Sequence, residues 1–458
     1  MARLVMKFGG TSVESAAAIT RVAGIVRSRL DRRPLVVVSA MGKTTNRLLA
    51  AAEQAAAGNL ADALTAAQDL RAFHARELSA LLPAAQLPAL EQILDREFAA
   101  LETTLQNVSQ AGSLTPPLWD EAASYGERLS SALVALAFPA LGVPASHLDA
   151  RQALITDTRH TQALPLYSRT YARFKELAPP LLAQGAAVMG GFIGSSSTGV
   201  TTTLGRGGSD FSAAIAGAAL DAEQIQIWTA VDGLLTCDPR VLPGGRRIRM
   251  VSFEEAAEMA YFGAKVLHPA TVLPAMEKNI PVRILNSRRP EVEGTLIVSR
   301  EVPSANPVKS IACKRGITVV HIRSLRMLMA HGFLHRIFEV FDRYRTPVDM
   351  VATSEVSVSL TIDQTHALEE ITAELARIAD VSVASNQAIV CLVGDDIRDT
   401  PGVAARAFAA LRDINVGMIS QGASRRNLSL AVNESALHAA VERLHEEFFA
   451  ALDPEVFA

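Results

Sequence analysis

The first part of the chain alternates short apolar runs with longer segments in which apolar residues recur every three or four positions. Runs of that length predict buried strands, and the longer segments predict amphipathic helices. Strands that alternate with helices favour a largely parallel sheet covered by helices on both faces. The expected strands are residues 4–8, 35–39, 186–193, 224–228 and 281–285, and the expected helices include 210–220, 252–262 and 270–278.

The helices of the first 150 residues show their expected starts and interruptions. Thr11 and Glu14 have the spacing of a capping box, so a helix is expected to begin there. Residues 46–141 are rich in Ala, Leu, Glu and Gln, which predicts a long helical region. Proline ends or kinks a helix. Interruptions are therefore expected at Pro83, Pro88, Pro116 and Pro117.

After a Pro- and charge-bearing linker, the pattern predicts two further small α/β units. Residues 316–386 follow a β-α-β-β-α-β order, and residues 387–458 repeat it without a last strand. The unassigned strand at 308–313 would complete that second sheet, so we predict that the first unit is inserted into the second. The expected domains are 1–295, a linker at 296–307, 316–386, and 308–315 plus 387–458.

The composition describes an ordinary globular protein, since 49% of the 458 residues are hydrophobic and 20% are charged. The net charge of −3 gives no support for nucleic-acid binding, which usually requires a basic excess. The three cysteines are far apart and form no Cys-x-x-Cys pair, which argues against a disulfide framework or a zinc site. No signal peptide or membrane-length apolar run is evident. We therefore expect a soluble cytoplasmic protein without a bound structural metal.

Two glycine-rich turns carry the candidate chemistry. Lys7-Phe8-Gly9-Gly10-Thr11-Ser12 follows the first strand, and Gly205-Arg206-Gly207-Gly208-Ser209-Asp210 precedes a helix. Adjacent glycines let backbone N–H groups approach an anion closely, and the start of the following helix carries partial positive charge. Two such turns that meet in one fold would bind a polyphosphate. The sequence therefore predicts a phosphoryl-transfer enzyme.

The two turns belong to a longer set of motifs that runs along the chain in a fixed order. The motifs are Lys7-Phe8-Gly9-Gly10-Thr11-Ser12, Val38-Ser39-Ala40-Met41-Gly42, Thr45-Asn46, Gly126-Glu127, residues 201–210, Cys237-Asp238-Pro239-Arg240, residues 262–269 and Thr353-Ser354-Glu355-Val356-Ser357. This set resembles the aspartokinases, which phosphorylate the side-chain carboxylate of aspartate, and is closest to their single-function, lysine-sensitive branch. The resemblance implies an α/β amino-acid-kinase fold followed by two ferredoxin-like βαββαβ ACT domains.

The resemblance implies roles for the two glycine turns. Lys7 would contact the β- and γ-phosphate oxygens of ATP, the amides of Gly9 and Gly10 would receive the transferring group, and Asp210 would hold Lys7 in place. A carboxylate acceptor has a pKa near 4 and is already ionised, so no general base is needed. The remaining task is to neutralise charge, for which lysine, backbone N–H groups and Mg²⁺ are suited.

The substrate aspartate would be bound by four residues. Arg206 matches the position that binds the α-carboxylate, where a guanidinium can bond both oxygens. Glu127 would meet the α-ammonium, and Thr45 and Ser209 would supply hydroxyl contacts. Taken without its context, Glu127 is more typical of a solvated helix residue. The neighbouring Gly126 and the family match favour the binding role.

The nucleotide side departs from the family pattern. The matching positions are Lys7, Thr229, Ala230, Leu235, Arg240 and Lys265. The family usually has Trp-Thr-Asp where this chain has Trp228-Thr229-Ala230, so an acidic side chain is absent. Leu235 likewise replaces a frequent aromatic residue. We expect weakened or altered nucleotide binding in an enzyme that is still active.

The ACT region would bind a feedback effector, with lysine as the expected one. Asp349 and Glu355 are the acidic groups available for an ε-ammonium, while Met329 and Ala330 replace a polar pair found in some relatives. The effector would act through a homodimer, or a dimer of dimers, whose ACT units bias an equilibrium between active and inactive states. The implied effector residues are Met327, Ala330, Phe333, Leu334, Val348, Asp349, Ser354 and Glu355.

Four other interpretations stay open. A related kinase could act on glutamate, acetylglutamate or UMP, although Glu127 and the tandem C-terminal units argue against it. A catalytically silent amino-acid sensor is favoured by Ala230 alone. Gly42-Lys43-Thr44 has the end of a P-loop but lacks its leading glycine. His268 could be a metal ligand, but no second cluster of ligands accompanies it.

Overall fold

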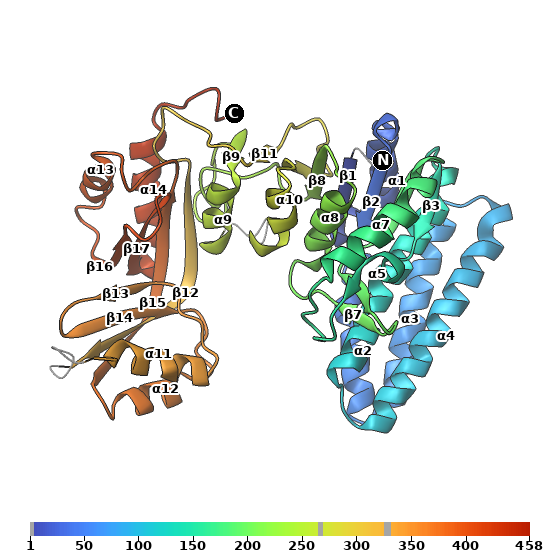
Figure 1. The fold of residues 1–458 in the computed structure, drawn as a ribbon, viewed down its shortest axis with the longest axis horizontal. Coiled ribbons are helices and arrows are strands. Elements are labelled where there is room, and N and C mark those ends of the chain that lie inside the picture. The colour runs from blue at the N-terminus through green and yellow to red at the C-terminus, as the bar shows by residue number, and fades with distance from the viewer. Residues whose placement is uncertain (1–3, 264–268, 325–330) are drawn as a thin grey trace. The chain divides into compact units, whose positions relative to one another are not determined.

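The computed structural model describes residues 4–263, 269–324 and 331–458, which form two compact units (Figure 1). The first unit is Met1–Leu234 with Val266–Arg300, and the second is Leu235–Lys265 with Glu301–Ala458. The junction at residue 300 is close to the boundary expected near residue 295. Residues 235–265 are different, because they group with the C-terminal unit although the sequence places them in the catalytic domain.

The first unit is built on a mainly parallel sheet, as predicted. Its strands lie in the order β3-β5-β2-β1-β8-β10-β11. Every neighbouring pair is parallel except β10 and β11, which are antiparallel. The strands are β1 (Leu4–Phe8), β2 (Pro34–Val38), β3 (Ala145–Leu148), β5 (Ala186–Gly190), β8 (Gln224–Thr229), β10 (Val282–Asn286) and β11 (Thr295–Val298).

A small second sheet changes one predicted strand. The expected strand 186–193 is interrupted after Gly190, because Phe192 adopts a positive φ of 66° and turns the chain. The chain then continues into a separate sheet with the order β4-β6-β7. Its strands are β4 (Ile155–Thr156), β6 (Ile193–Ser196) and β7 (Thr201–Thr203).

Helices cover both faces of the main sheet. Leu4, Met6 and Phe8 of β1 belong to a core that includes residues of α1 to α5, while Val5 points to the other face and is also fully buried. On that face α8 packs on β1 and α7 on β5. The helices are α1 (Ala16–Arg27), α2 (Thr44–Ala56), α3 (Leu60–Ser79), α4 (Leu87–Ala111), α5 (Pro116–Ala140), α6 (Ala150–Ala153), α7 (Tyr167–Leu182), α8 (Gly208–Ala219) and α10 (Leu273–Glu277).

The predicted prolines mark helix ends, but the predicted capping box is wrong. Pro88 and Pro116 lie in the first turns of α4 and α5, where proline is tolerated. Helix α1 begins later than expected, with Ser15 as its N-cap and the Ser15 hydroxyl accepting from the Ala18 N–H. The preceding segment Gly10–Ser12 forms a 3₁₀ turn instead, so Thr11 and Glu14 do not start the helix.

The second unit contains the two predicted ACT-like sheets, joined by two long strands. Residues Ser310–Lys314 pair antiparallel with Ile389–Val393, which confirms that the strand before the first unit completes the second. The predicted short strands are continuous, because β12 and β15 run through bulges between Lys314 and Val319. The strand order is β13-β14-β12-β15-β17-β16.

The bounds of these elements follow the predicted order. The strands are β12 (Ser310–Arg323), β13 (Val351–Thr353), β14 (Ser357–Ile362), β15 (Asp380–Val393), β16 (Val416–Gln421) and β17 (Asn427–Asn433). The helices are α11 (Phe333–Arg343), α12 (Leu368–Leu375), α13 (Val403–Ala410) and α14 (Leu437–Phe449). Apolar residues of α11 and α12 pack on β12 and β14 to form the core of the first ACT-like unit.

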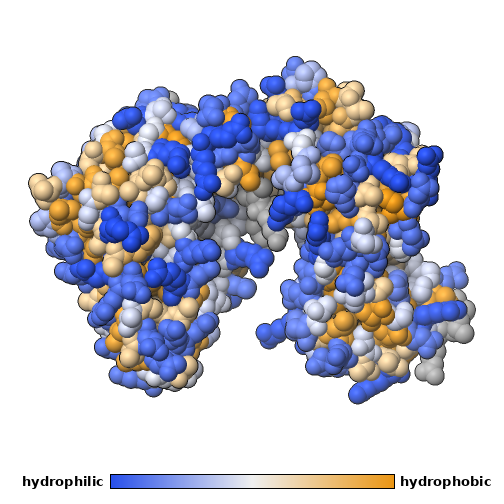
Figure 2. Space-filling view, turned by 180° about the vertical axis from the view of Figure 1, so that it is seen from behind, coloured by the Kyte–Doolittle hydropathy of each residue, from blue (hydrophilic) through white to orange (hydrophobic). Residues whose placement is uncertain are grey.

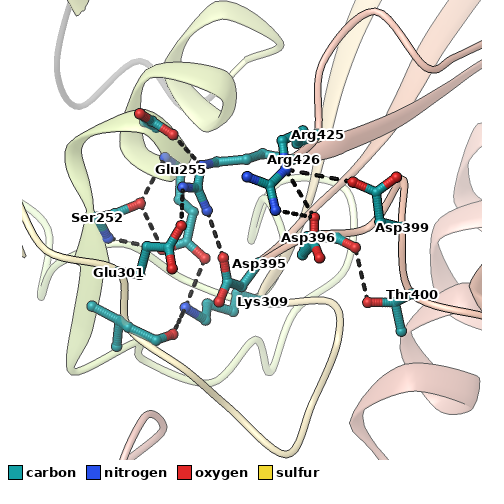
Figure 3. A network of polar contacts seen from close by, with 12 residues as sticks. Ser252, Glu255, Glu301, Lys309, Asp395, Asp396, Asp399, Thr400, Arg425 and Arg426 are labelled. Atoms are coloured by element: carbon teal, nitrogen blue, oxygen red, sulfur yellow. Dashed lines mark hydrogen bonds and ion pairs between the residues drawn. The ribbon is translucent and has the colours of Figure 1, made fainter.

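Acidic residues fix α9 (Phe253–Tyr261) to the C-terminal part of the second unit (Figure 3). This helix follows β9 (Met250–Ser252) and begins with a capping box between Ser252 and Glu255. The side chains of Glu255 and Lys309 are both fully buried, 2.7 Å apart. In the same way Glu254 pairs with Arg426, and Glu258 accepts a hydrogen bond from Asn427. These contacts, with that of Glu255 to Lys309, explain why residues 235–265 group with the C-terminal region.

The surface is mixed in character. The face drawn in Figure 2 shows hydrophilic residues interspersed with small apolar patches. In the part of the chain that the structure describes, no helix combines the length and apolar character required to cross a membrane.

Candidate active site

A cavity of about 310 Å³ in the first unit brings the two glycine turns together. It opens at the carboxyl ends of β1, β2 and β5, where ligand sites of parallel sheets are usually found. The predicted residues that line it are of three kinds: the lysine expected to contact phosphate, residues expected to bind aspartate, and the aspartate residue expected to hold that lysine in place. The lining residues are Lys7, Ser39, Thr45, Glu127, Phe192, Gly205, Gly207, Gly208, Ser209 and Asp210.

Lys7 and Asp210 form an ion pair inside this cavity. Lys7 lies near the end of β1 and Asp210 in the first turn of α8, and their Nζ and Oδ1 atoms are 2.7 Å apart. Their side chains are 12% and 14% exposed, so the pair is largely shielded from water. The start of α8 adds partial positive charge to that of the lysine. The arrangement presents a fixed cation to an anionic group.

The first glycine turn is tightly constrained. A Cβ on Gly10 would lie 2.8 Å from the Ala40 carbonyl oxygen, so a side chain there would clash with backbone. The carbonyl of Gly10 also accepts a hydrogen bond from the Gly42 N–H at 3.0 Å. The N–H of Gly9 donates to the Trp228 carbonyl at 3.2 Å. In this conformation the Gly9 amide is therefore engaged, and it does not face the cavity as a free donor.

Glu127 is a buried carboxyl group with an unused oxygen. Only 4% of the residue is exposed; Oε1 accepts from the Ala40 N–H at 3.2 Å, and Oε2 has no hydrogen-bond partner among the described residues. Burial raises the pKa of Glu127 to about 8, although the Ala40 N–H and the charge of Lys7 act in the opposite direction. A buried, unpartnered carboxyl oxygen fits a ligand that brings its own positive charge.

Hydroxyl groups also line this cavity. The Ser39 hydroxyl donates to the Ser209 hydroxyl at 3.1 Å, and Thr45 lines the same cavity. Ser39 belongs to a motif named above but was assigned no role, and Phe192 was placed in an expected strand; both also line the cavity. The available signal was position, because Ser39 directly follows β2 and Phe192 lies two residues after β5, strands whose carboxyl ends form the site.

Arg206 lies on the second turn but not among the lining residues. The residue is exposed, and its guanidinium makes no hydrogen bond or ion pair with another described residue. The flanking Gly205 and Gly207 both adopt positive φ angles, of 76° and 73°, which glycine accommodates without strain. The turn therefore holds the backbone at the cavity while the guanidinium extends into solvent.

The predicted nucleotide residues are divided between the two units. Thr229 ends β8 and Ala230 follows it in the first unit, and the Thr229 carbonyl accepts from the Ser287 N–H at 2.9 Å. Leu235 and Arg240 belong to the second unit, where Arg240 pairs with Asp238 at 2.6 Å and remains 68% exposed. Lys265 lies outside the described residues.

The predicted effector residues cluster around the start of α11 and the strands β13 and β14. Asp349 is the most constrained of them, with a side chain only 5% exposed. Both of its oxygens contact Lys314 Nζ, at 2.8 and 2.9 Å, and the Tyr261 hydroxyl donates to Oδ1 at 3.2 Å. Phe333 is buried, whereas Leu334, Ser354 and Glu355 are exposed and Val348 is half-buried. Met327 and Ala330 lie outside the described residues.

No group of three or more His, Cys, Asp or Glu residues with metal-binding geometry occurs within residues 4–263, 269–324 and 331–458. His268 is not among the described residues. The side chains that line the cavity carry one lysine and two carboxyl groups. This donor set suits a nucleotide that carries its own Mg²⁺ on its phosphates.

Known proteins resemble the chain over almost its whole length. Residues 2–286 match the amino acid kinase family, and residues 390–448 match the ACT domain. Aspartokinase 3, chloroplastic, of Arabidopsis thaliana is 39% identical over 97% of this chain and 81% of its own length. Lysine-sensitive aspartokinase 3 of Escherichia coli is 37% identical over 97% of this chain and 99% of its own length.

Solved structures of aspartokinases are also similar to this chain over almost its whole length. Aspartokinase III of E. coli in complex with lysine and aspartate (T-state) has a TM-score of 0.85 at 36% identity, covering 98% of this chain and all of that one. Its complex with aspartate and ADP (R-state) has a TM-score of 0.81 at 37% identity, covering 97% of this chain and 99% of that one.

The fold and the lysine-bearing glycine turn define a member of the amino acid kinase family, to which this chain belongs. Such enzymes transfer a phosphoryl group from a nucleotide. Within the family the chain belongs to the aspartokinases, phosphotransferases whose acceptor is a carboxyl group.

Proposed function

We propose that this protein transfers the γ-phosphoryl group of ATP to the β-carboxylate of L-aspartate, giving 4-phospho-L-aspartate. That reaction opens the pathway to lysine, threonine and methionine. The observation that carries the proposal is one cavity in which the Lys7–Asp210 ion pair faces the unpartnered buried oxygen of Glu127. ATP requires a cation for its phosphates, and an amino acid requires an anion for its ammonium group. The proposed location is the cytoplasm.

The proposed chemistry needs charge neutralisation more than proton transfer. The aspartate β-carboxylate is ionised at neutral pH and attacks without a base. Lys7, held by Asp210, offsets the charge that develops on the transferring group. Glu127 binds the α-ammonium and Arg206 the α-carboxylate, while Thr45 and Ser209 contact the substrate through hydroxyls. Mg²⁺ carried by the nucleotide supplies further positive charge.

An assay of aspartate-dependent ADP release tests this function. We expect ADP formation with L-aspartate and Mg·ATP, and none with glutamate, acetylglutamate or UMP in its place. Hydroxylamine trapping of the acyl phosphate would show that the acceptor is a carboxylate. ADP release with one of the other acceptors would assign the enzyme to a different substrate. A chain that binds amino acids but releases no ADP would be a sensor.

The substitution Ala230→Asp tests the altered nucleotide side. The residue is exposed and follows β8, so an aspartate can be accommodated there without a change in the core. The restored acidic group would add a contact to ATP in the ground state and the transition state alike, so we expect a lower KM for ATP with little change in kcat. Steady-state kinetics at saturating aspartate measure both constants. Unchanged values for both would refute the role of this position.

We further propose feedback inhibition by lysine, acting on a homodimer or a dimer of dimers through the first ACT-like unit. The support is Asp349, whose buried carboxylate already binds an ε-ammonium, that of Lys314. The site therefore has the geometry for such a group, and a free lysine would compete with Lys314. The neighbouring contact from Tyr261, at the end of α9, would be altered by the same exchange.

Lysine inhibition and its loss in Asp349→Asn test this regulation. Because a charge-assisted contact to the ammonium is lost, we expect the lysine concentration for half-inhibition to rise about tenfold. The matched control is Asp363→Asn, since Asp363 also pairs with Lys314 at 2.8 Å but is not an implied effector residue. Activity is measured against lysine, threonine and S-adenosylmethionine. A flat response to lysine would exclude it as the effector.

A further inference from the structure

One fully buried carboxylate outside the cavity joins its own helix to two distant segments. Asp120 lies on α5 with no exposed surface. Its Oδ1 accepts from the Thr203 hydroxyl at 2.5 Å, and its two oxygens accept from the Thr161 N–H at 3.0 and 3.1 Å. The ring Nδ1 of His160 lies 2.6 Å from Oδ2. A charge this deeply buried requires such partners, and all of them come from distant segments.

The partners of Asp120 lead directly to the second glycine turn. Thr203 is the last residue of β7, three positions before Arg206. The backbone of Thr161 lies against the turn itself, since a Cβ on Gly205 would be 3.1 Å from the Thr161 carbonyl oxygen. The Ala163 N–H also donates to the Thr203 carbonyl at 2.9 Å. One carboxylate therefore holds both the strand that enters the turn and the loop that packs on it.

Thr161 adopts an unfavourable backbone conformation that this arrangement maintains. Its φ of 69° lies in the left-handed region, which a β-branched residue rarely adopts. Such strain persists only where the surroundings impose it, and it is concentrated near functional sites. Here the Thr161 N–H is fixed by both oxygens of Asp120. Without the carboxylate, the loop would relax away from Gly205.

Helix α5 also carries Glu127, two turns after Asp120. Trp119, beside Asp120, contacts the ring of Phe192, a residue of the cavity wall, with the ring centroids 6.5 Å apart. The helix that carries Glu127 is thus bonded to the strand that enters the Arg206 turn and to the loop that packs on that turn. The α-ammonium and the α-carboxylate of aspartate are attached to the same carbon atom. The distance between Glu127 and Arg206, which are proposed to bind them, must therefore be closely fixed.

We propose that Asp120 is a positioning residue that sets the Arg206 turn relative to Glu127 and thereby determines the affinity for aspartate. It touches neither substrate. The inference rests on the proposed roles of Arg206 and Glu127. Thr203, Thr161 and His160 are the groups through which it acts, and the nucleotide side of the site is not involved.

The substitution Asp120→Asn keeps the shape of the side chain but replaces an accepting oxygen with a donor. We expect the KM for aspartate to rise at least about tenfold, because a buried charge-assisted bond is lost, while the KM for ATP stays within about twofold. The control is Glu97→Gln. Glu97, on α4, is also a buried carboxylate, and it pairs at 2.7 Å with Arg128, which lies on α5 as Asp120 does. That variant should lower Tm without a selective change in the KM for aspartate.

A double-mutant cycle separates positioning from general destabilisation. In an Arg206→Ala background, adding Asp120→Asn should raise the KM for aspartate less than about twofold, since the group that it positions is already absent. A full additional increase there would overturn the proposal and leave the role of Arg206 intact. If Arg206→Ala alone leaves the KM unchanged, the proposed role of Arg206 fails, and positioning through it fails as well.

Thr203→Val provides a second variant if Asp120→Asn does not fold. It removes one hydroxyl donor to Asp120 and nearly conserves side-chain volume. We expect a smaller rise in the KM for aspartate, with the KM for ATP unchanged. Equal changes in the two KM values, for either variant, would show a merely structural role and overturn the proposal.

Discussion

Replacing Lys7 with methionine should lower kcat at least about 1,000-fold, because fixed cations at a transferring phosphoryl group contribute effects of this size. Lys7 is largely shielded from water and held 2.7 Å from Asp210, so solvent cannot replace its charge. Methionine has a similar length and retains the packing of the side chain while removing the ammonium. Folding, checked by Tm, should be maintained.

The matched control for this loss is Lys43→Met. Lys43 belongs to the neighbouring turn, between β2 and α2, but it is exposed and does not line the cavity of the two glycine turns. Its replacement should change kcat less than about twofold, since exposed charges interact weakly. If Lys7→Met retained more than a tenth of the activity, Lys7 would not be the residue that neutralises the phosphoryl group.

The second large effect is expected at Glu127, where Glu127→Gln should raise the KM for aspartate about 10- to 100-fold. A charged hydrogen bond to an ammonium contributes roughly 1.5–3 kcal/mol, and each 1.4 kcal/mol corresponds to a factor of ten in affinity. The glutamine keeps the shape of the side chain, and its oxygen can still accept from the Ala40 N–H. The KM for ATP should change little, because the proposed contact of Glu127 is with the amino acid and not with the nucleotide.

The raised pKa of Glu127 gives this prediction a pH dependence. With a pKa of about 8, the free enzyme is protonated at Glu127 at pH 7, whereas binding the ammonium requires the ionised form. The KM for aspartate should therefore fall as pH rises from 6 and level off above about 8. The same shift from 4.5 means that the free energy of unfolding decreases with rising pH over this window, since only the folded state keeps the proton.

Glu127→Gln should abolish this pH dependence, and Glu121→Gln is the control. Glu121 lies on the same helix and pairs with Arg128 at 2.9 Å, away from the residues that line the cavity. Its variant should keep the wild-type pH profile. A profile in Glu127→Gln that still follows the wild type would assign the titration to another group.

Local pattern was sufficient to predict much of the fold. Apolar runs predicted the buried strands, and Pro88 and Pro116 marked the starts of long helices. The inserted ACT-like unit followed from counting strands, because the second sheet lacked one. The interruption at Phe192 was missed, since nothing in an apolar run shows that a bulky residue will adopt a positive φ.

The site was predictable where the chemistry lies in contiguous motifs and not where it depends on distant partners. Lys7 and Asp210 are separated by about two hundred residues, yet each belongs to a glycine turn that can be recognised by itself. Asp120 has no such motif. Its importance comes from Thr161 and Thr203, which only the fold brings to it. For the same reason the pairing of Asp349 with Lys314 could not be read from either segment.

The acidic residues of α9 determine which segments of this enzyme can be replaced by the corresponding segments of a relative. A catalytic fragment that ended at residue 300 would retain Glu255 on a helix face with buried Ala256 and Met259, but without Lys309. An isolated buried carboxylate of this kind costs several kcal/mol. A chimera that takes its regulation from another aspartokinase would need residues 235–265 to travel with the C-terminal domains. The exchangeable module is therefore discontinuous in sequence, and recombination at a single crossover would divide it.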